Sequence, residues 1–142
     1  MRKIDGSPEV VLFIDGASRG NPGPGAVGAV LYSSSGQKIN EISRYVGETT
    51  NNVAEYLALI YGLQEAFFAG AERVSVNTDS QLVARQLKGT YKVRDAKMKV
   101  FFDIAKNLFR GFQDVSIHEI PREKNSEADS LANQALDSRV LF

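Results

Sequence analysis

The chain has 142 residues and a mass of 15.6 kDa, a size that fits one domain with a substantial hydrophobic core. It contains no cysteine and one histidine, which excludes a disulfide scaffold, a zinc ribbon, a thiol nucleophile and a polyhistidine metal cluster. Seventeen basic residues balance seventeen acidic ones, so any binding to nucleic acid must come from a local patch.

The first third of the sequence predicts three strands. Residues 10–14 form a short apolar run typical of a buried strand, and Asp15 follows at its expected end. Residues 20–25 are rich in glycine and proline and predict a loop. Residues 26–32 and 38–46 predict an antiparallel pair around a turn, with imperfect alternation in the second strand that indicates a bulge.

The remaining segments predict helices that alternate with strands. Apolar residues at helical spacing predict the helices, and alternation of apolar and polar residues predicts the strands. Gly70, Gly89 and Gly111 mark the ends of three predicted helices. The expected elements are a helix at 52–69, a strand at 73–79, helices at 80–87 and 96–110, a strand at 115–120 and a helix at 126–136. This order predicts an α/β domain over residues 1–142, a mixed sheet covered by helices, with flexible tails at 1–8 and 137–142.

The apolar run after the N-terminal residues is too short for a signal peptide or a membrane span. We therefore expect a cytoplasmic protein without membrane association.

Four carboxylates occupy comparable places in the predicted elements: Asp15, Glu55, Asp79 and Asp129. Each has an ordinary structural explanation, because Asp15 could begin a turn and the other three could cap helices. Glu55, however, shares its helix face with small and apolar residues, so its side chain should point toward the sheet. The four could then converge at one end of the sheet.

Such a cluster would require counter-ions, because carboxylates packed together repel one another and lose hydration. Oxygen ligands without histidine or cysteine favour Mg²⁺ or Mn²⁺. Two such ions, one activating water and one stabilising the leaving oxygen, would suit phosphoryl transfer.

Short segments in a fixed order carry a further pattern: FIDGAS at 13–18, GNPGPG at 20–25, TTNN at 49–52 with Glu55, TDSQ at 78–81 and NSEADSLA at 125–132. Together they cover most of the chain and resemble the type 1 ribonuclease H family, which hydrolyses the RNA strand of RNA–DNA hybrids. The resemblance implies a five-stranded mixed sheet of order 3-2-1-4-5 flanked by about four helices. It implies two metal ions held by Asp15, Glu55, Asp79 and Asp129, and endonucleolytic products with 3′-hydroxyl and 5′-phosphate ends.

The resemblance also implies substrate contacts. Asn21, Asn51, Asn52 and Gln81 should lie in the minor groove near RNA 2′-hydroxyls and base edges, and Thr50 should contact a DNA phosphate. Amide side chains suit this role because they donate and accept hydrogen bonds without demanding one base. Helix capping is an equally plausible use of Asn51 or Asn52.

The sequence departs from the family pattern in several places. Residues 121–125 lack the family's loop histidine, so Arg122 or Glu123 is the candidate substitute, with Arg122 preferred because a guanidinium attracts phosphate. His118 falls inside a predicted strand, where a structural role is the simpler interpretation. Glu48 and Asp95 replace an Arg and an Asn of the family's DNA-phosphate pocket, which weakens that pocket and the preference for hybrid over double-stranded RNA.

The helical basic protrusion of many bacterial members is missing here. Residues 85–99 still hold six basic residues against one acidic residue, a local charge of +5. This segment is either a solvated face or the surface that grips the hybrid backbone through Lys92, Arg94 and Lys97.

Three functions are therefore compared. The leading hypothesis is a monomeric Mg²⁺- or Mn²⁺-dependent ribonuclease H, with additional activity on double-stranded RNA left open. The alternative is a non-catalytic hybrid-binding module with the same fold, which the presence of all four carboxylates disfavours. A sugar kinase or actin-like ATPase ranks third because it needs two lobes, and 142 residues supply one.

Overall fold

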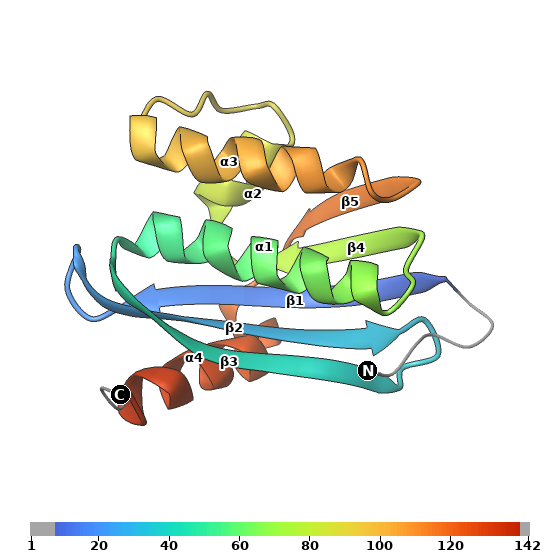
Figure 1. The fold of residues 1–142 in the computed structure, drawn as a ribbon, viewed down its shortest axis with the longest axis horizontal. Helices are drawn as coiled ribbons and strands as arrows, with labels where there is room; N and C mark the ends of the chain where they lie inside the picture. The colour runs from blue at the N-terminus through green and yellow to red at the C-terminus, as the bar shows by residue number, and fades with distance from the viewer. Residues whose placement is uncertain (1–7, 140–142) are drawn as a thin grey trace.

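A five-stranded mixed sheet forms the centre of the molecule in the computed structural model, which describes residues 8–139 (Figure 1). The strands are β1 (Glu9–Ser18), β2 (Gly23–Ser33), β3 (Lys38–Thr49), β4 (Arg73–Thr78) and β5 (Asp114–Glu119). Their order is β3-β2-β1-β4-β5, with β2 antiparallel to both β1 and β3 and with β4 parallel to both β1 and β5. The α/β class and the predicted sheet order are confirmed.

Helices cover both faces of this sheet. They are α1 (Asn51–Phe68), α2 (Gln81–Leu87), α3 (Ala96–Phe109) and α4 (Ser126–Asp137), with a short 3₁₀ turn, η1 (Arg122–Lys124), before α4. Figure 1 shows α1 and α3 on one side of the sheet and α4 on the other. The four predicted helices are confirmed with ends that differ by one residue at most.

The main core lies between the sheet and α1. Val10, Leu12 and Ile14 of β1 are fully buried there with Leu59 and Leu63 of α1. A smaller apolar cluster lies under α4, where Ala135 and Leu136 pack on Ala26 of β2. Successive side chains of β1 and β2 therefore pack on opposite faces of the sheet. Both faces are covered, which explains why these central strands are apolar on both sides.

Two sequence predictions in this region are wrong. Residues 23–25 are not loop but the start of β2, because a proline near the first residue of a strand still offers its carbonyl, and Arg19 N donates to Pro24 O at 2.8 Å. Asp15 does not end its strand either, because β1 continues to Ser18 against β2. It is the first residue beyond the pairing with β4, which stops at Ile14.

The predicted irregularity in the third strand is confirmed. The β2–β3 register shifts between Gly25 and Ala26 and again between Leu31 and Tyr32, each time leaving one extra residue in β3.

The predicted tails fall largely outside the description: residues 1–7 and 140–142 are not part of the described structure, and Asp137 is the last residue of α4. Within residues 8–139, none of the helices combines the length and apolar character needed to cross a membrane.

Candidate active site

Three carboxylates from separate elements meet beside the end of β4. Asp15 lies on β1, Glu55 on the second turn of α1, and Asp79 directly after β4. One oxygen of each lies within 4.8 Å of the others. Asp15 and Glu55 are buried, and Asp79 is half-buried. The structure thus brings together three side chains that are far apart in the sequence.

Two glycines allow the helices to approach Asp15. A Cβ at Gly16 would overlap the backbone of Ala54 and Glu55, so the glycine lets α1 lie directly on β1. The Gly16 N–H then donates to Oε1 of Glu55. On the neighbouring strand Gly28 pairs with Asp15, and a Cβ there would overlap the Ala128 carbonyl of α4. The sequence analysis missed Gly28, although a glycine inside an otherwise apolar strand is a signal of close backbone approach.

Asp129 is the fourth predicted carboxylate, and it lies next to Asp15. It stands in the first turn of α4, half-buried, and interacts with Asp15 so as to raise the pKa of that carboxyl. It is not among the three carboxylates whose oxygens all lie within 4.8 Å of one another. The close packing of α4 on Gly28 explains this placement, because Ala128 precedes Asp129 on the helix.

At α1 and α2, other residues take the capping roles that could have explained Glu55 and Asp79. Thr50 Oγ1 accepts from Val53 N at 3.3 Å and caps α1, while Ser80 Oγ accepts from Val83 N at 3.2 Å and caps α2. Asn125 precedes α4 without making a side-chain cap. The carboxylates of Glu55, Asp79 and Asp129 are therefore not used as helix caps.

Asn125 instead supports the cluster, which sequence reasoning did not foresee. Its side chain is buried, donates from Nδ2 to the Ile14 carbonyl at 2.8 Å, and acts to lower the pKa of Asp79. The residue looks like a cap in the sequence because it stands immediately before Ser126.

Crowding disfavours the ionised form of these carboxylates. Burial and then the charge of Glu55 raise the pKa of Asp15, with the hydrogen bond from Asp129 and the charge of Asp79 adding to the shift. Burial also raises the pKa of Glu55, although the Gly16 N–H opposes it. The pKa of Asp79 is raised by burial, against the hydrogen bond from Asn125 and the charge of Arg122.

This cluster fits divalent cations. In the absence of positive charge, several buried acids within 4.8 Å retain protons, and a bound cation removes that need. All the donors are carboxylate oxygens, which suits hard ions such as Mg²⁺ or Mn²⁺.

The predicted amide side chains lie on a neighbouring surface. Asn21 Oδ1 accepts from Asn51 N at 3.0 Å, and Asn51 Oδ1 accepts from Ser18 N at 2.9 Å. These bonds join the loop after β1 to the start of α1. Within residues 8–139, no protein hydrogen bond engages Nδ2 of either asparagine, so both donors remain for another molecule. Asn52 is half-buried and Gln81 is exposed.

The two candidates for the missing histidine differ in their relation to the acids. Arg122 and Glu123 are both exposed on η1. The positive charge of Arg122 acts on both Glu55 and Asp79 and opposes the rise of their pKa values, whereas Glu123 carries a charge of the opposite sign. His118 is exposed on β5 and contacts Ser116 Oγ at 3.1 Å.

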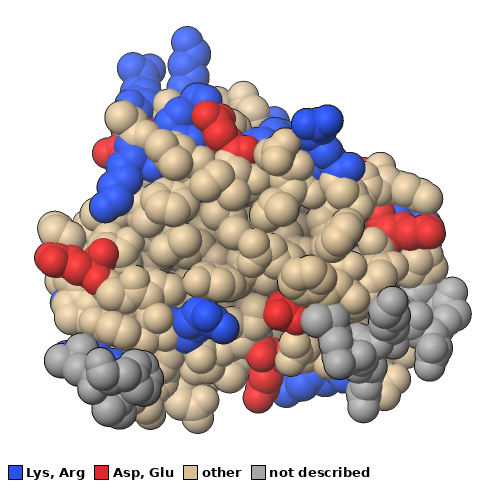
Figure 2. Space-filling view, in the orientation of Figure 1, with Lys and Arg blue, Asp and Glu red and all other residues tan. Residues whose placement is uncertain are grey.

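The basic segment projects from the end of the molecule that carries α2 and α3. Lys92 and Arg94 are exposed in the loop between these helices, and Lys97 is exposed on the first turn of α3. Figure 2 shows blue side chains gathered over this region, above a broad tan face. Asp95 accepts from Met98 N at 2.9 Å and caps α3, which gives this departure from the family pattern a structural use. The loop has no helix of its own, so the absence of a helical protrusion is confirmed.

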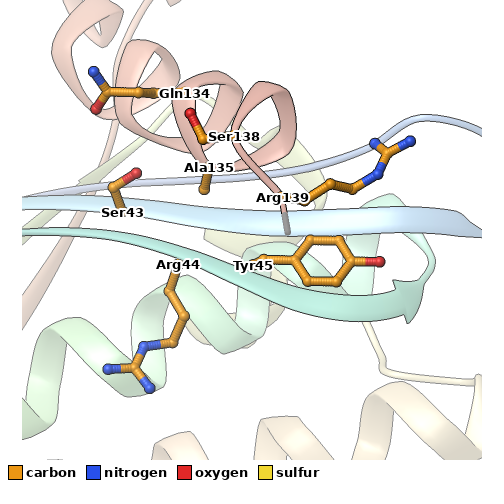
Figure 3. A pocket seen from close by; sticks show the side chains of 7 residues that line it. All are labelled: Ser43, Arg44, Tyr45, Gln134, Ala135, Ser138 and Arg139. Carbon is orange, nitrogen blue, oxygen red and sulfur yellow. The ribbon is translucent and has the colours of Figure 1, made fainter. Parts of the chain in front are cut away.

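A separate groove lies away from the carboxylates. It has a volume of about 590 Å³ between β3 and the end of α4, and none of the carboxylates lines it (Figure 3). Arg44 points to the opposite side of the sheet from Ser138, and its guanidinium lies 4.9 Å from the ring centre of Tyr61. We assign this groove no role in the site.

Comparison with known proteins gives consistent matches. Residues 13–135 match the model of the family described as reverse transcriptase-like. The chain is 45% identical to ribonuclease HI of Halobacterium salinarum over 94% of its own length and 67% of the relative. It is 40% identical to a bifunctional protein of Mycobacterium tuberculosis over 92% of its length, and this match spans only 36% of the relative.

Solved structures agree with these relatives. The crystal structure of RNase H1 from H. salinarum superposes with a TM-score of 0.90 at 45% identity, covering 92% of this chain and 99% of that one. LC11-RNase H1, crystallised in complex with an RNA/DNA hybrid, superposes with a TM-score of 0.86 at 40% identity, covering 90% and 96%. The fold, the order of the motifs and these matches agree: the chain belongs to the reverse transcriptase-like family and, within it, to the type 1 ribonuclease H enzymes.

Proposed function

We propose that the chain hydrolyses the RNA strand of RNA–DNA hybrids as a metal-dependent endoribonuclease and leaves 3′-hydroxyl and 5′-phosphate ends. The observation that carries the proposal is the cluster of Asp15, Glu55 and Asp79, whose oxygens lie within 4.8 Å of one another. A relative crystallised with an RNA/DNA hybrid supports the choice of substrate.

Asp15, Glu55, Asp79 and Asp129 would hold the divalent ions. Two bound Mg²⁺ or Mn²⁺ ions supply activation of the attacking water and stabilisation of the leaving oxygen in an in-line displacement. The chain contributes rigidity: Glu55 accepts a hydrogen bond from the Gly16 N–H, and Asp15 lies within the pairing of β1 with β2. The carboxylates are thus fixed before the ions arrive, which reduces the cost of ordering them.

The asparagine pair would read the minor groove of the hybrid. Because the protein already uses the oxygens of Asn21 and Asn51, their Nδ2 groups would donate to 2′-hydroxyl oxygens or base acceptors of the RNA. Asn52 on α1 and Gln81 on α2 would extend this surface. Every base offers a minor-groove acceptor, so cleavage should depend little on sequence.

A threonine hydroxyl and several basic side chains would bind the phosphates of the substrate. Thr50 caps α1 through its oxygen and keeps its hydroxyl proton for a DNA phosphate. Arg122 would attract the phosphate near the carboxylates, and we prefer it to Glu123 because its charge acts on Glu55 and Asp79. Lys92, Arg94 and Lys97 would bind the hybrid backbone farther away.

The test is cleavage of an end-labelled RNA–DNA hybrid with Mg²⁺, with Mn²⁺ and with EDTA, next to double-stranded RNA and duplex DNA. We expect metal-dependent cutting of the hybrid RNA, with products that a polymerase extends from a free 3′-hydroxyl. Asp15→Asn should abolish cutting, whereas Asp114→Asn, which changes an exposed carboxylate on β5, should retain it.

Two results would contradict the proposal. Cutting that persists in EDTA would exclude the metal-dependent reaction. Binding of the hybrid without cutting in either metal would favour the non-catalytic module. The double-stranded RNA arm decides whether the hybrid is the preferred substrate. A cytoplasmic location and a monomeric state remain predictions.

A further inference from the structure

The loop at residues 88–95 has little apolar packing to hold it. Its side chains are exposed except that of Val93, which is half-buried against the core. It nevertheless carries Lys92 and Arg94, which the proposed function places against the substrate backbone. A loop that binds phosphates with so little packing of its own needs other contacts to fix its backbone.

Two consecutive residues at the end of α2 provide these contacts. The Arg85 carbonyl accepts from Thr90 N at 2.8 Å and from Tyr91 N at 3.2 Å. Gln86 Nε2 donates to the Lys92 carbonyl at 3.3 Å. The guanidinium of Arg85 also lies over the Tyr91 ring, 5.4 Å from its centre, and donates to the Tyr91 hydroxyl at 2.9 Å.

A buried tyrosine fixes the direction in which Gln86 donates. Gln86 is 3% exposed and Tyr56 is fully buried, and the Tyr56 hydroxyl donates to Gln86 Oε1 at 2.6 Å. A tyrosine hydroxyl that donates to the amide oxygen requires the amide nitrogen to face the other way, toward the Lys92 carbonyl. The reversed amide would leave buried groups unpaired, at a cost in free energy.

Tyr56 also connects the loop to a second helix. Tyr56 follows Glu55 on α1, and its ring lies 6.2 Å from that of Phe102 on α3, centre to centre. The same residue therefore touches both helices that flank the loop.

We propose that Tyr56 and Gln86 are positioning residues for substrate binding, which hold the basic loop through the buried hydrogen bond between the Tyr56 hydroxyl and the Gln86 amide. The proposal rests on the proposed function for its substrate, an RNA–DNA hybrid, but its structural part does not.

The variants that test it are Tyr56→Phe and Gln86→Met, which keep volume and remove the hydrogen bond. We expect either to raise KM for the hybrid by about 3- to 10-fold, as the loss of one buried hydrogen bond allows, with kcat changed by less than about 2-fold. The double variant should be no worse than Gln86→Met, because both changes break the same contact. The salt dependence of binding should keep its slope, because no cation is removed.

Tyr32→Phe is the matched control. It also removes a tyrosine hydroxyl that donates to another side chain, Glu127, but that contact joins β2 to α4. We expect its KM to equal that of the parent. A KM increase equal to that of Tyr56→Phe would overturn the proposal, since the effect would then be general.

Amide hydrogen exchange tests the structural part without any substrate. In Tyr56→Phe and Gln86→Met, exchange at Thr90 and Tyr91 should increase at least several-fold, while the amides of α1 and β4 keep their protection. Unchanged exchange at residues 88–95, or faster exchange with an unchanged KM, would refute the proposal. Failure of the parent protein to cleave the hybrid would refute the proposed function alone, because the exchange result would stand.

Discussion

Removing one charge from the carboxylate cluster should stabilise the metal-free protein. Asp15→Asn keeps the shape of the side chain and cannot ionise, so the folded protein no longer has to hold a proton at this position. Two ionised carboxylates 4.8 Å apart repel by about 3 kcal/mol at an effective dielectric constant of 20, and Asp15 faces two such neighbours, Glu55 and Asp79. Burial is the largest cause that raises the pKa of Asp15, from 3.8 to about 9.

The sign of the pH effect follows from this shift. Between pH 3.8 and about pH 9 the folded protein binds the Asp15 proton more tightly than the unfolded chain does, so stability falls as pH rises through that range. At pH 8 the resulting decrease in the free energy of unfolding, relative to acid pH, cannot exceed about 6 kcal/mol, which is the difference in proton-binding free energy between the folded and unfolded states. At pH 5 the decrease cannot exceed about 2 kcal/mol. Local relaxation reduces both figures. We therefore expect Asp15→Asn to raise the free energy of unfolding by about 2–4 kcal/mol at pH 8, a Tm increase of roughly 6–12 °C.

Urea and thermal unfolding in EDTA at pH 5 and pH 8 measure this difference. The gain should be larger at pH 8, and added Mg²⁺ should stabilise the parent more than the variant. Asp114→Asn, an exposed carboxylate, should change the free energy of unfolding by no more than about 0.5 kcal/mol at either pH. An Asp15→Asn protein less stable than the parent at pH 8 in EDTA would show instead that the Asp15 carboxylate stabilises the fold.

Three further predictions concern the substrate surface and the frame of the site. Replacing Lys92, Arg94 and Lys97 by alanine should raise KM and flatten the plot of log affinity against log salt by roughly 2–3 units, with kcat nearly unchanged; an unaltered slope in a filter-binding titration would remove these residues from the interface. Gly28→Ala should cost more than about 2 kcal/mol in urea unfolding, since its Cβ would overlap the Ala128 carbonyl and lie 2.7 Å from Ala132 N; a neutral result would show that α4 moves away freely. Arg122→Gln should lower kcat by about 10-fold and Glu123→Gln by less than about 3-fold in single-turnover cleavage; the reverse order would transfer the role to Glu123.

Much of the fold was predictable because the signals are local. The apolar spacing of α1 and the alternation of β4 each follow from a short window of sequence, and both elements are confirmed. Predictions failed where pairing with a distant strand decides the conformation. Glycine and proline at 23–25 indicate a loop, but these residues pair with the end of β3 and therefore belong to β2.

The candidate site was also predictable only in part. The positions of Asp15, Glu55 and Asp79 on their elements favoured convergence, and the residue types favoured a hard cation. The sequence alone could not reveal why the helices approach so closely, because Gly28 matters only through α4, about 100 residues away. Asn125 and Gln86 were missed for a related reason: an amide buried by tertiary packing has no local signature.

The most direct measurement is anomalous diffraction from a crystal of the protein soaked in Mn²⁺. We expect anomalous density for two ions bounded by the carboxylates of Asp15, Glu55, Asp79 and Asp129, and its loss in crystals of Asp15→Asn. Absence of density between these carboxylates, in a crystal of protein that cleaves the hybrid in Mn²⁺, would exclude the proposed two-metal site.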